Sequence, residues 1–131
     1  MTGGVYLVAA EPSGDALGAD VIAALRAQAP DVQLAGVGLD AMARAGVAGP
    51  VDMSDLAILG FFDGLKALDR VKAKAVAVAE DIAARRPAAA VFIDSWGFSL
   101  RAAQALKTFA PEVARIKLIG PQVWATRPGR A

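Results

Sequence analysis

The stretch that decides the fold class is Val5-Tyr6-Leu7-Val8-Ala9-Ala10-Glu11-Pro12-Ser13-Gly14-Asp15. Residues 5–9 form a continuous apolar run of good strand formers, which predicts a strand buried on both faces. Residues 11–15 are typical of a turn. In residues 16–29 apolar side chains recur at helical spacing and Pro30 follows, so a helix is expected there. The stretch predicts one strand–turn–helix unit.

The same alternation continues along the chain. Further strands are expected at 32–37, 51–53 (a brief one), 89–93 and 116–119, and further helices at 39–45, 61–86 and 97–109. Strands that alternate with helices indicate a parallel sheet with right-handed crossovers. The 131 residues are therefore predicted to form one α/β domain, a Rossmann-like parallel sheet with flanking helices. No closing helix follows the last strand, so we expect the chain to end inside a domain.

The composition excludes several kinds of site. The chain has no His and no Cys, which excludes Ser-His-Asp triads, imidazole or thiolate zinc sites and disulfides. A net charge of +1 lacks the basic excess of a nucleic-acid binder. The start of the chain does not resemble a secretory signal, and no apolar run is long enough to span a bilayer. We expect a cytoplasmic protein, soluble or peripheral on a membrane.

The residues after the first strand are candidates for ligand binding, because ligands of open parallel sheets bind at the carboxyl ends of the strands. Glu11 and Ser13 would hydrogen-bond a polyhydroxylated ligand, and Gly14 permits close approach to the backbone. The alternative stays open that Ser13 or Asp15 simply caps the following helix.

Asp94 is the candidate catalytic residue. It directly follows the apolar strand 89–93, so it is expected at the rim of the sheet. A carboxylate there accepts a proton from a sugar hydroxyl. The alternative is a cap for the helix that starts near residue 97.

Residues 36–41 carry a second possible ligand motif, G-x-G-x-x-A, which resembles a dinucleotide-binding turn. It follows the second predicted strand rather than the first. On this reading the chain is a non-catalytic, Rossmann-like nucleotide-binding module.

Residues 56–74 form an amphipathic segment with basic side chains. Its apolar positions lie near one helical face; they are Phe61, Phe62, Leu65, Leu68 and Val71. A basic amphipathic helix lies on anionic membrane surfaces. The alternative is an ordinary helix that packs this face against a core.

Five segments together resemble the lipid-A-disaccharide synthase family, in order and spacing. They are Ala10-Glu11-Pro12-Ser13-Gly14-Asp15, Gly36-Val37-Gly38 with Met42, Asp55-Leu56-Ala57-Ile58-Leu59-Gly60, Ile93-Asp94, and Pro121-Gln122-Val123-Trp124-Ala125. Departures occur at Gly97 and Ser99, where the family usually has a carboxylate and an amide. These departures leave open the alternative that the chain is a decayed paralogue of the enzyme.

The resemblance implies an inverting glycosyltransferase of the two-domain GT-B architecture. Residues 1–131 would be its N-terminal, acceptor-side domain, and a further C-terminal domain would bind the UDP-sugar. The implied reaction joins UDP-2,3-diacylglucosamine to 2,3-diacylglucosamine 1-phosphate on the inner membrane, with no cofactor and no metal. Asp94 would be the general base. The implied substrate-binding residues are Glu11, Ser13, Gly14, Asp15 and Gln122.

Overall fold

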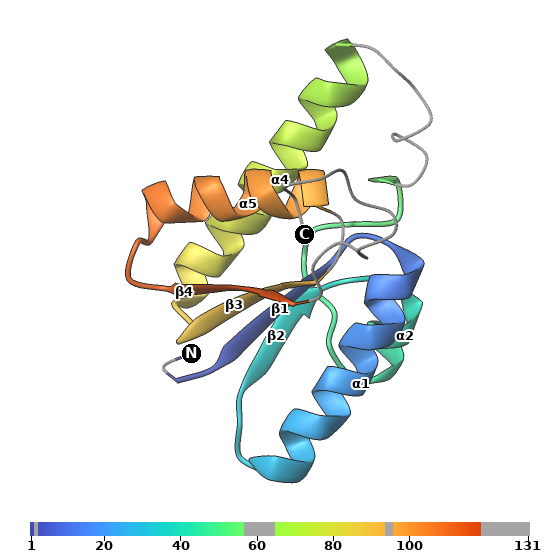
Figure 1. Cartoon of the computed structure of the whole chain (residues 1–131), viewed down its shortest axis with the longest axis vertical. Helices are drawn as coiled ribbons and strands as arrows, with labels where there is room; N and C mark the ends of the chain where they lie inside the picture. The colour runs from blue at the N-terminus through green and yellow to red at the C-terminus, as the bar shows by residue number, and fades with distance from the viewer. Residues whose placement is uncertain (2, 57–64, 94–95, 119–131) are drawn as a thin grey trace, which may run out of the picture.

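The computed structural model describes residues 1, 3–56, 65–93 and 96–118 of the chain. Within these ranges it contains four strands and four helices that alternate along most of the sequence (Figure 1). The strands are β1 (Val5–Ala9), β2 (Leu34–Val37), β3 (Ala89–Ile93) and β4 (Ala114–Leu118); the helices are α1 (Pro12–Gln28), α2 (Asp40–Arg44), α4 (Leu65–Arg85) and α5 (Trp96–Phe109).

The four strands form one parallel sheet in the order β2-β1-β3-β4. Residues 5–8 of β1 pair with β2 on one side, residues 5–9 pair with β3 on the other, and Ala9 lies opposite Ile93. The strand order therefore reverses between β1 and β3. The sheet and its flanking helices confirm the predicted Rossmann-like α/β class.

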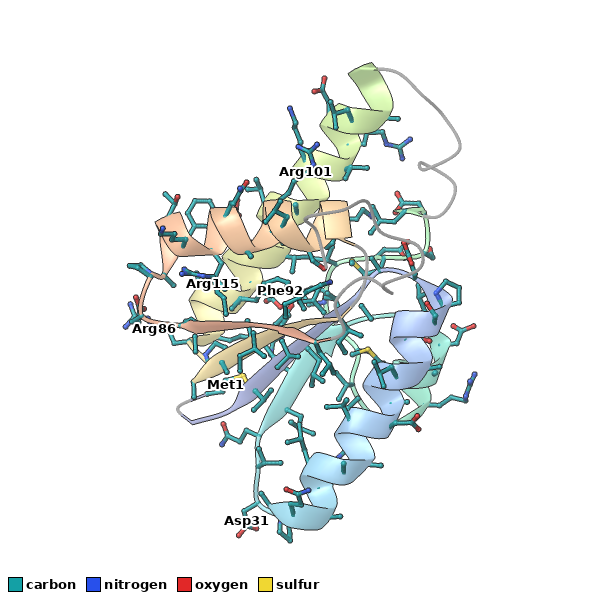
Figure 2. All side chains as sticks on the ribbon, in the orientation of Figure 1. Met1, Asp31, Arg86, Phe92, Arg101 and Arg115 are labelled. Atoms are coloured by element: carbon teal, nitrogen blue, oxygen red, sulfur yellow. The ribbon has the colours of Figure 1, made fainter. Side chains whose placement is uncertain are left out.

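The helices cover the two faces of the sheet in separate pairs (Figure 1). Side chains of a strand alternate between faces, so each strand contributes to both layers. Leu7 of β1 packs with Ile22 and Met42 in the α1–α2 layer. Tyr6 packs with Ile82 in the α4–α5 layer. Figure 2 shows side chains filling the space on both sides of the sheet.

A buried tyrosine attaches β1 to α4. The Tyr6 hydroxyl donates a 2.6 Å hydrogen bond to Asp81, whose carboxylate also accepts hydrogen bonds from Arg85 Nε at 3.1 Å. Burial raises the pKa of the Tyr6 phenol above its ordinary value, and the hydrogen bond to Asp81 raises it further. The neutral phenol is thereby favoured in the folded state.

The start of the first helix and the strand expected at 51–53 were wrong for reasons of local chemistry. Helix α1 begins at Pro12 instead of residue 16, because the fixed φ of proline suits the first helical position. The brief strand expected at 51–53 does not form. Instead Asp52 accepts hydrogen bonds from the backbone N–H and the hydroxyl of Ser54, a local turn that also lowers the pKa of Asp52.

Ion pairs hold this turn against α4. Lys74 contacts the Asp55 carboxylate at 2.5 Å and donates to the backbone carbonyl of Asp52. Arg70 lies 3.6 Å from the same Asp55 carboxylate. Met53, between these anchors, is buried in the α4–α5 layer. The polar contacts thus position an apolar side chain in the core without strand pairing.

Candidate functional site at the carboxyl edge of the sheet

The carboxyl ends of β1 and β3 are neighbours at the point where the strand order reverses. Ala9 and Ile93, the last residues of these strands, are paired. In open α/β sheets this crevice is where ligands bind. Asp94 is the next residue in the sequence after Ile93, and both Asp94 and Gln122 lie outside the described residues.

The segment after β1 opens helix α1 at this edge. Glu11 occupies the N-cap position with extended backbone angles, and its side chain makes no capping hydrogen bond. Glu11 and Ser13 are both exposed, whereas Gly14 is buried. Since neither Ser13 nor Asp15 occupies the N-cap of α1, the capping role considered for them does not apply to this helix.

Asp15 caps a different helix. Its Oδ1 accepts hydrogen bonds from the backbone N–H of Leu39 at 2.8 Å and of Met42 at 3.0 Å, and its Oδ2 accepts one from Ala41 at 2.8 Å. The residue is only 5 % exposed. Its carboxylate therefore satisfies the N-terminal amides of α2, and this contact ties α1 to α2.

The glycine motif at 36–41 is explained by packing. A Cβ at Gly36 would collide with the backbone carbonyl oxygen of Leu7, and one at Gly38 would collide with the Met42 sulfur. In dinucleotide sites the amides of such a helix N-terminus bind the pyrophosphate. Here Asp15 places a carboxylate on those amides. This arrangement speaks against the nucleotide-binding module.

The proposed membrane face of residues 61–71 is only partly covered by the structure. Phe61 and Phe62 lie outside the described residues, and Leu65 begins α4. Leu68 is half-buried. Val71 is also half-buried and packs against the core of the α4–α5 layer, as the alternative reading of this segment expected. The core-facing role therefore holds for Val71.

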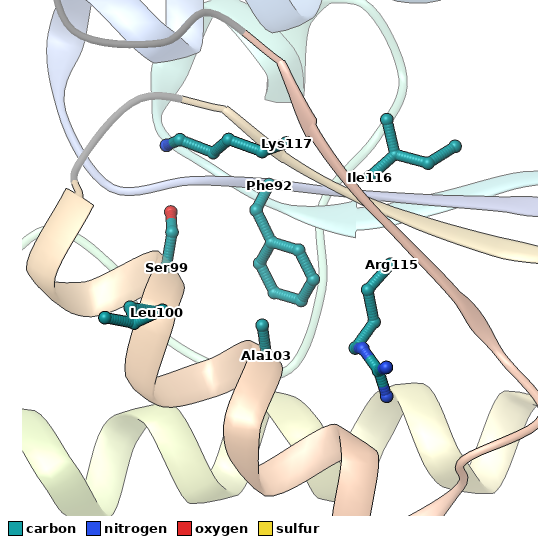
Figure 3. A pocket seen from close by; sticks show the side chains of 7 residues that line it. All are labelled: Phe92, Ser99, Leu100, Ala103, Arg115, Ile116 and Lys117. Carbon is teal, nitrogen blue, oxygen red and sulfur yellow. The ribbon is translucent and has the colours of Figure 1, made fainter. Parts of the chain in front are cut away.

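Two residues that the sequence analysis did not connect lie near the end of β3. Ser99 of α5 is buried, with 4 % of its surface exposed, and Lys117 of β4 pairs with Phe92. Both side chains line a pocket between α5 and β4, shown in Figure 3. The spacing of Arg115 and Lys117, two residues apart on a strand, was the available sequence signal that they share a face.

The fold defines the chain as a Rossmann-like α/β domain whose strand order reverses between β1 and β3. Among known proteins, the family model described as lipid-A-disaccharide synthetase matches residues 5–131. The chain therefore belongs to the lipid-A-disaccharide synthase family.

Individual relatives agree with the family match. The lipid-A-disaccharide synthase of Ruegeria pomeroyi is 40 % identical over 127 residues, which is 97 % of this chain and 31 % of the relative. That of Paramagnetospirillum magneticum is 37 % identical over 127 residues, 96 % of this chain and 33 % of the relative. That of Granulibacter bethesdensis is 38 % identical over 126 residues, 96 % of this chain and 32 % of the relative. The chain spans about a third of the length of these curated relatives.

Proposed function

We propose that this chain serves as the acceptor-side domain of a GT-B glycosyltransferase that makes lipid A disaccharide. The reaction joins UDP-2,3-diacylglucosamine to 2,3-diacylglucosamine 1-phosphate, giving the β-1,6-linked disaccharide 1-phosphate and UDP. The observation that carries this proposal is the family match over residues 5–131. The reversal of strand order between β1 and β3 supports it, because ligands of open α/β sheets bind outside the carboxyl ends of the strands at such a reversal.

Asp94 is the proposed general base. Its carboxylate takes the proton of the acceptor 6-hydroxyl as that oxygen attacks the anomeric carbon of the donor. The new O6–C1 bond forms while the bond from C1 to the UDP oxygen breaks, so a single in-line displacement inverts the configuration. The position of Asp94 in the sequence, one residue after the paired Ile93, supports this role.

Glu11, Ser13 and Gly14 are proposed to bind the sugar portion of a substrate. Glu11 and Ser13 are exposed at the start of α1, beside the carboxyl end of β1. Gln122 is proposed as a further contact from its place in the matched P-x-V-W-A segment. Asp15 acts on this site indirectly, since its hydrogen bonds hold α1 and α2 together.

The test of the general base is Asp94→Asn in the full-length protein that contains this chain. An amide cannot accept the hydroxyl proton, so disaccharide formation is expected to fall by about 10²- to 10⁴-fold. Asp20→Asn, at an exposed position of α1, is the matched control and should leave the rate unchanged. A rate near the unmodified level in Asp94→Asn would remove Asp94 from the mechanism.

Contact with an anionic membrane surface is proposed for Phe61, Phe62, Leu65 and Leu68, because both substrates carry acyl chains. Replacing these four residues with Ser should reduce binding to vesicles containing anionic lipid and leave the circular-dichroism spectrum unchanged. Val71→Ser, at the core-packed position, is the comparison and should reduce stability instead. Loss of fold in the fourfold variant would assign these side chains to the core. Among the described helices, none is both long and apolar enough to cross a membrane.

A further inference from the structure

The first residue of the chain is bonded to the carboxyl end of α4. The ammonium group of Met1 donates a 2.7 Å hydrogen bond to the backbone carbonyl of Arg85, the last residue of that helix and 84 positions away in the sequence. Arg86 follows the helix with a φ of 52°, and Figure 2 shows Met1 and Arg86 at the same end of the molecule. A cation at a helix C-terminus interacts favourably with the helix dipole. The Met1 ammonium therefore stabilises this end of α4.

The backbone after α4 leaves the Arg85 carbonyl to this ammonium. A helical hydrogen bond to that carbonyl would come from the N–H of Ala89, four residues on. The N–H of Ala89 instead donates to the carbonyl of Gly4 at 3.4 Å, as does that of Ala88 at 2.8 Å. Pro87 has no N–H to offer. The start of the chain thus supplies both a donor for the end of the helix and an acceptor for the amides that follow it.

Met1 is held in this position by its other groups. Its carbonyl accepts a 3.3 Å hydrogen bond from the N–H of Gly4, which closes a turn. A Cβ at Gly4 would lie 2.4 Å from Met1 Cε, so the half-buried methionine side chain packs directly over this glycine. The ammonium is therefore placed by a turn and by a packed side chain.

Arg85 has a second, separate attachment to β1. Its guanidinium bonds Asp81 at 3.1 Å, and Asp81 accepts the hydrogen bond of the Tyr6 hydroxyl. Asp81 lies one helical turn before the carbonyl that Met1 contacts. The attachment through Tyr6 should therefore persist when the ammonium is lost, and the effect of that loss should stay at the end of the helix.

We propose that the α-amino group of Met1 is a modification-sensitive site that controls the docking of the carboxyl end of α4, in a polypeptide whose first residue is Met1. Two modifications remove the ammonium from this position. An aminopeptidase adds water across the Met1–Thr2 peptide bond, releases methionine and leaves the new amine on Thr2, about 3.8 Å farther along the backbone. An N-formyl group keeps the nitrogen uncharged until water hydrolyses it to formate and the free ammonium.

The test is amide hydrogen exchange, followed by mass spectrometry, on the polypeptide that contains this chain and starts at Met1. One sample has a free amine, and the other keeps its N-formyl group because deformylase is inhibited during expression. The Met1 side chain is the same in both, so only the charge differs. Exchange in segment 86–89, which contains the amides bonded to Gly4, should be about two- to fivefold faster in the formylated sample.

Residues 39–42 are the internal control for this comparison. Asp15 holds the amides of Leu39 and Met42 in the layer on the other face of the sheet, so their exchange should be the same in both samples. Equal exchange in segment 86–89 would overturn the proposal. An equal acceleration in both segments would also overturn it, because the ammonium would then act on global stability and not on the end of α4.

Removal of Met1 is tested with Thr2→Gln as the matched control. Methionine aminopeptidases act before small residues such as Thr2 and not before a side chain as large as Gln, so the variant keeps Met1 under the same treatment. The trimmed chain loses both the ammonium and the side chain over Gly4, so segment 86–89 should exchange at least as fast as in the formylated sample. A trimmed chain that exchanges as slowly as the treated variant would contradict the proposal. None of these readouts depends on the proposed glycosyl transfer.

Discussion

The two faces of the sheet differ in how completely the described residues fill them. On the α1–α2 face, glycines lie against other atoms: a Cβ at Gly18 would approach the Met42 sulfur to 2.6 Å, and one at Gly36 would meet backbone. On the α4–α5 face, a Cβ at Gly97 would meet no atom of the described residues within 4 Å, and a pocket is open beside Phe92. Among the described residues, the closed face uses polar and glycine residues for packing, whereas the open face has an unfilled pocket.

The largest expected effect is on the closed face, at Asp15. Asp15→Ala removes three hydrogen bonds to a carboxylate and leaves the amides of Leu39, Ala41 and Met42 without this partner. We expect a loss of about 3–4 kcal/mol in the free energy of unfolding, since each bond to a charged group contributes about 1.5–3 kcal/mol and the three are not additive. The measurement is urea unfolding followed by circular dichroism.

The controls for Asp15→Ala use the geometry of its two oxygens. Asp15→Asn keeps one oxygen acceptor but replaces the other with a donor that faces an N–H, so an intermediate loss is expected. Asp20→Ala, on the exposed side of α1, should change stability by less than about 0.5 kcal/mol. If Asp15→Ala were no more destabilising than Asp20→Ala, the contrast between the two faces would not hold.

The sequence predicts those features of the two faces that depend on residues close together in the chain, and it fails for those that depend on distant residues. Strands β1 and β3 are continuous apolar runs, and their burial follows from residue type alone. The start of α1 was misplaced because Pro12, Ser13 and Gly14 are equally common in turns and in first helical turns. Local residue preference does not distinguish these cases.

The roles of residues in and near the candidate site also depend on contacts between distant parts of the sequence. Asp15 reaches amides 24 to 27 residues away, a pairing that no local pattern contains. The glycines at 36 and 38 matched a nucleotide motif by spacing, but their packing against Leu7 and Met42 appears only in three dimensions. Glu11 and Ser13 were expected to follow the carboxyl end of the first strand, and they do, because chain order alone places them there.

A pH-dependent effect is expected on the α4–α5 face, at Tyr6. Because the folded state raises the pKa of this phenol, the unfolded chain loses the proton first, above about pH 10. The stability contributed by Tyr6 is therefore fully present below pH 10 and is lost as the pH rises further, by at most about 1.4 kcal/mol per pH unit. Tyr6 is the only tyrosine in the sequence, so absorbance of tyrosinate reports on this side chain alone.

The experiment compares urea midpoints at pH 9 and pH 11 for the unmodified chain and for Tyr6→Phe. At pH 9 the variant should be less stable by about 1 kcal/mol, the contribution of one hydrogen bond. The variant should also lose less stability than the unmodified chain between the two pH values, which separates Tyr6 from the lysines. Ionisation of Tyr6 near pH 10 in the folded chain would contradict the burial and the Asp81 contact.

The smallest expected effect, and the one of opposite sign, is at Gly97 in the first turn of α5. Its φ is outside the left-handed region and a Cβ there meets no atom of the described residues, so Gly97→Ala should stabilise the chain by about 0.5–1 kcal/mol through helix propensity. Gly97→Asp should stabilise it similarly, because a carboxylate near a helix N-terminus interacts favourably with the helix dipole. Gly36→Ala is the matched control and should destabilise by about 1–3 kcal/mol. If the two substitutions change the free energy of unfolding in opposite directions, packing requires glycine at position 36 but not at position 97. The fold would then not explain why Gly97 replaces the carboxylate that the family usually has. If both substitutions destabilise the chain, a side chain at position 97 is not accommodated on this face.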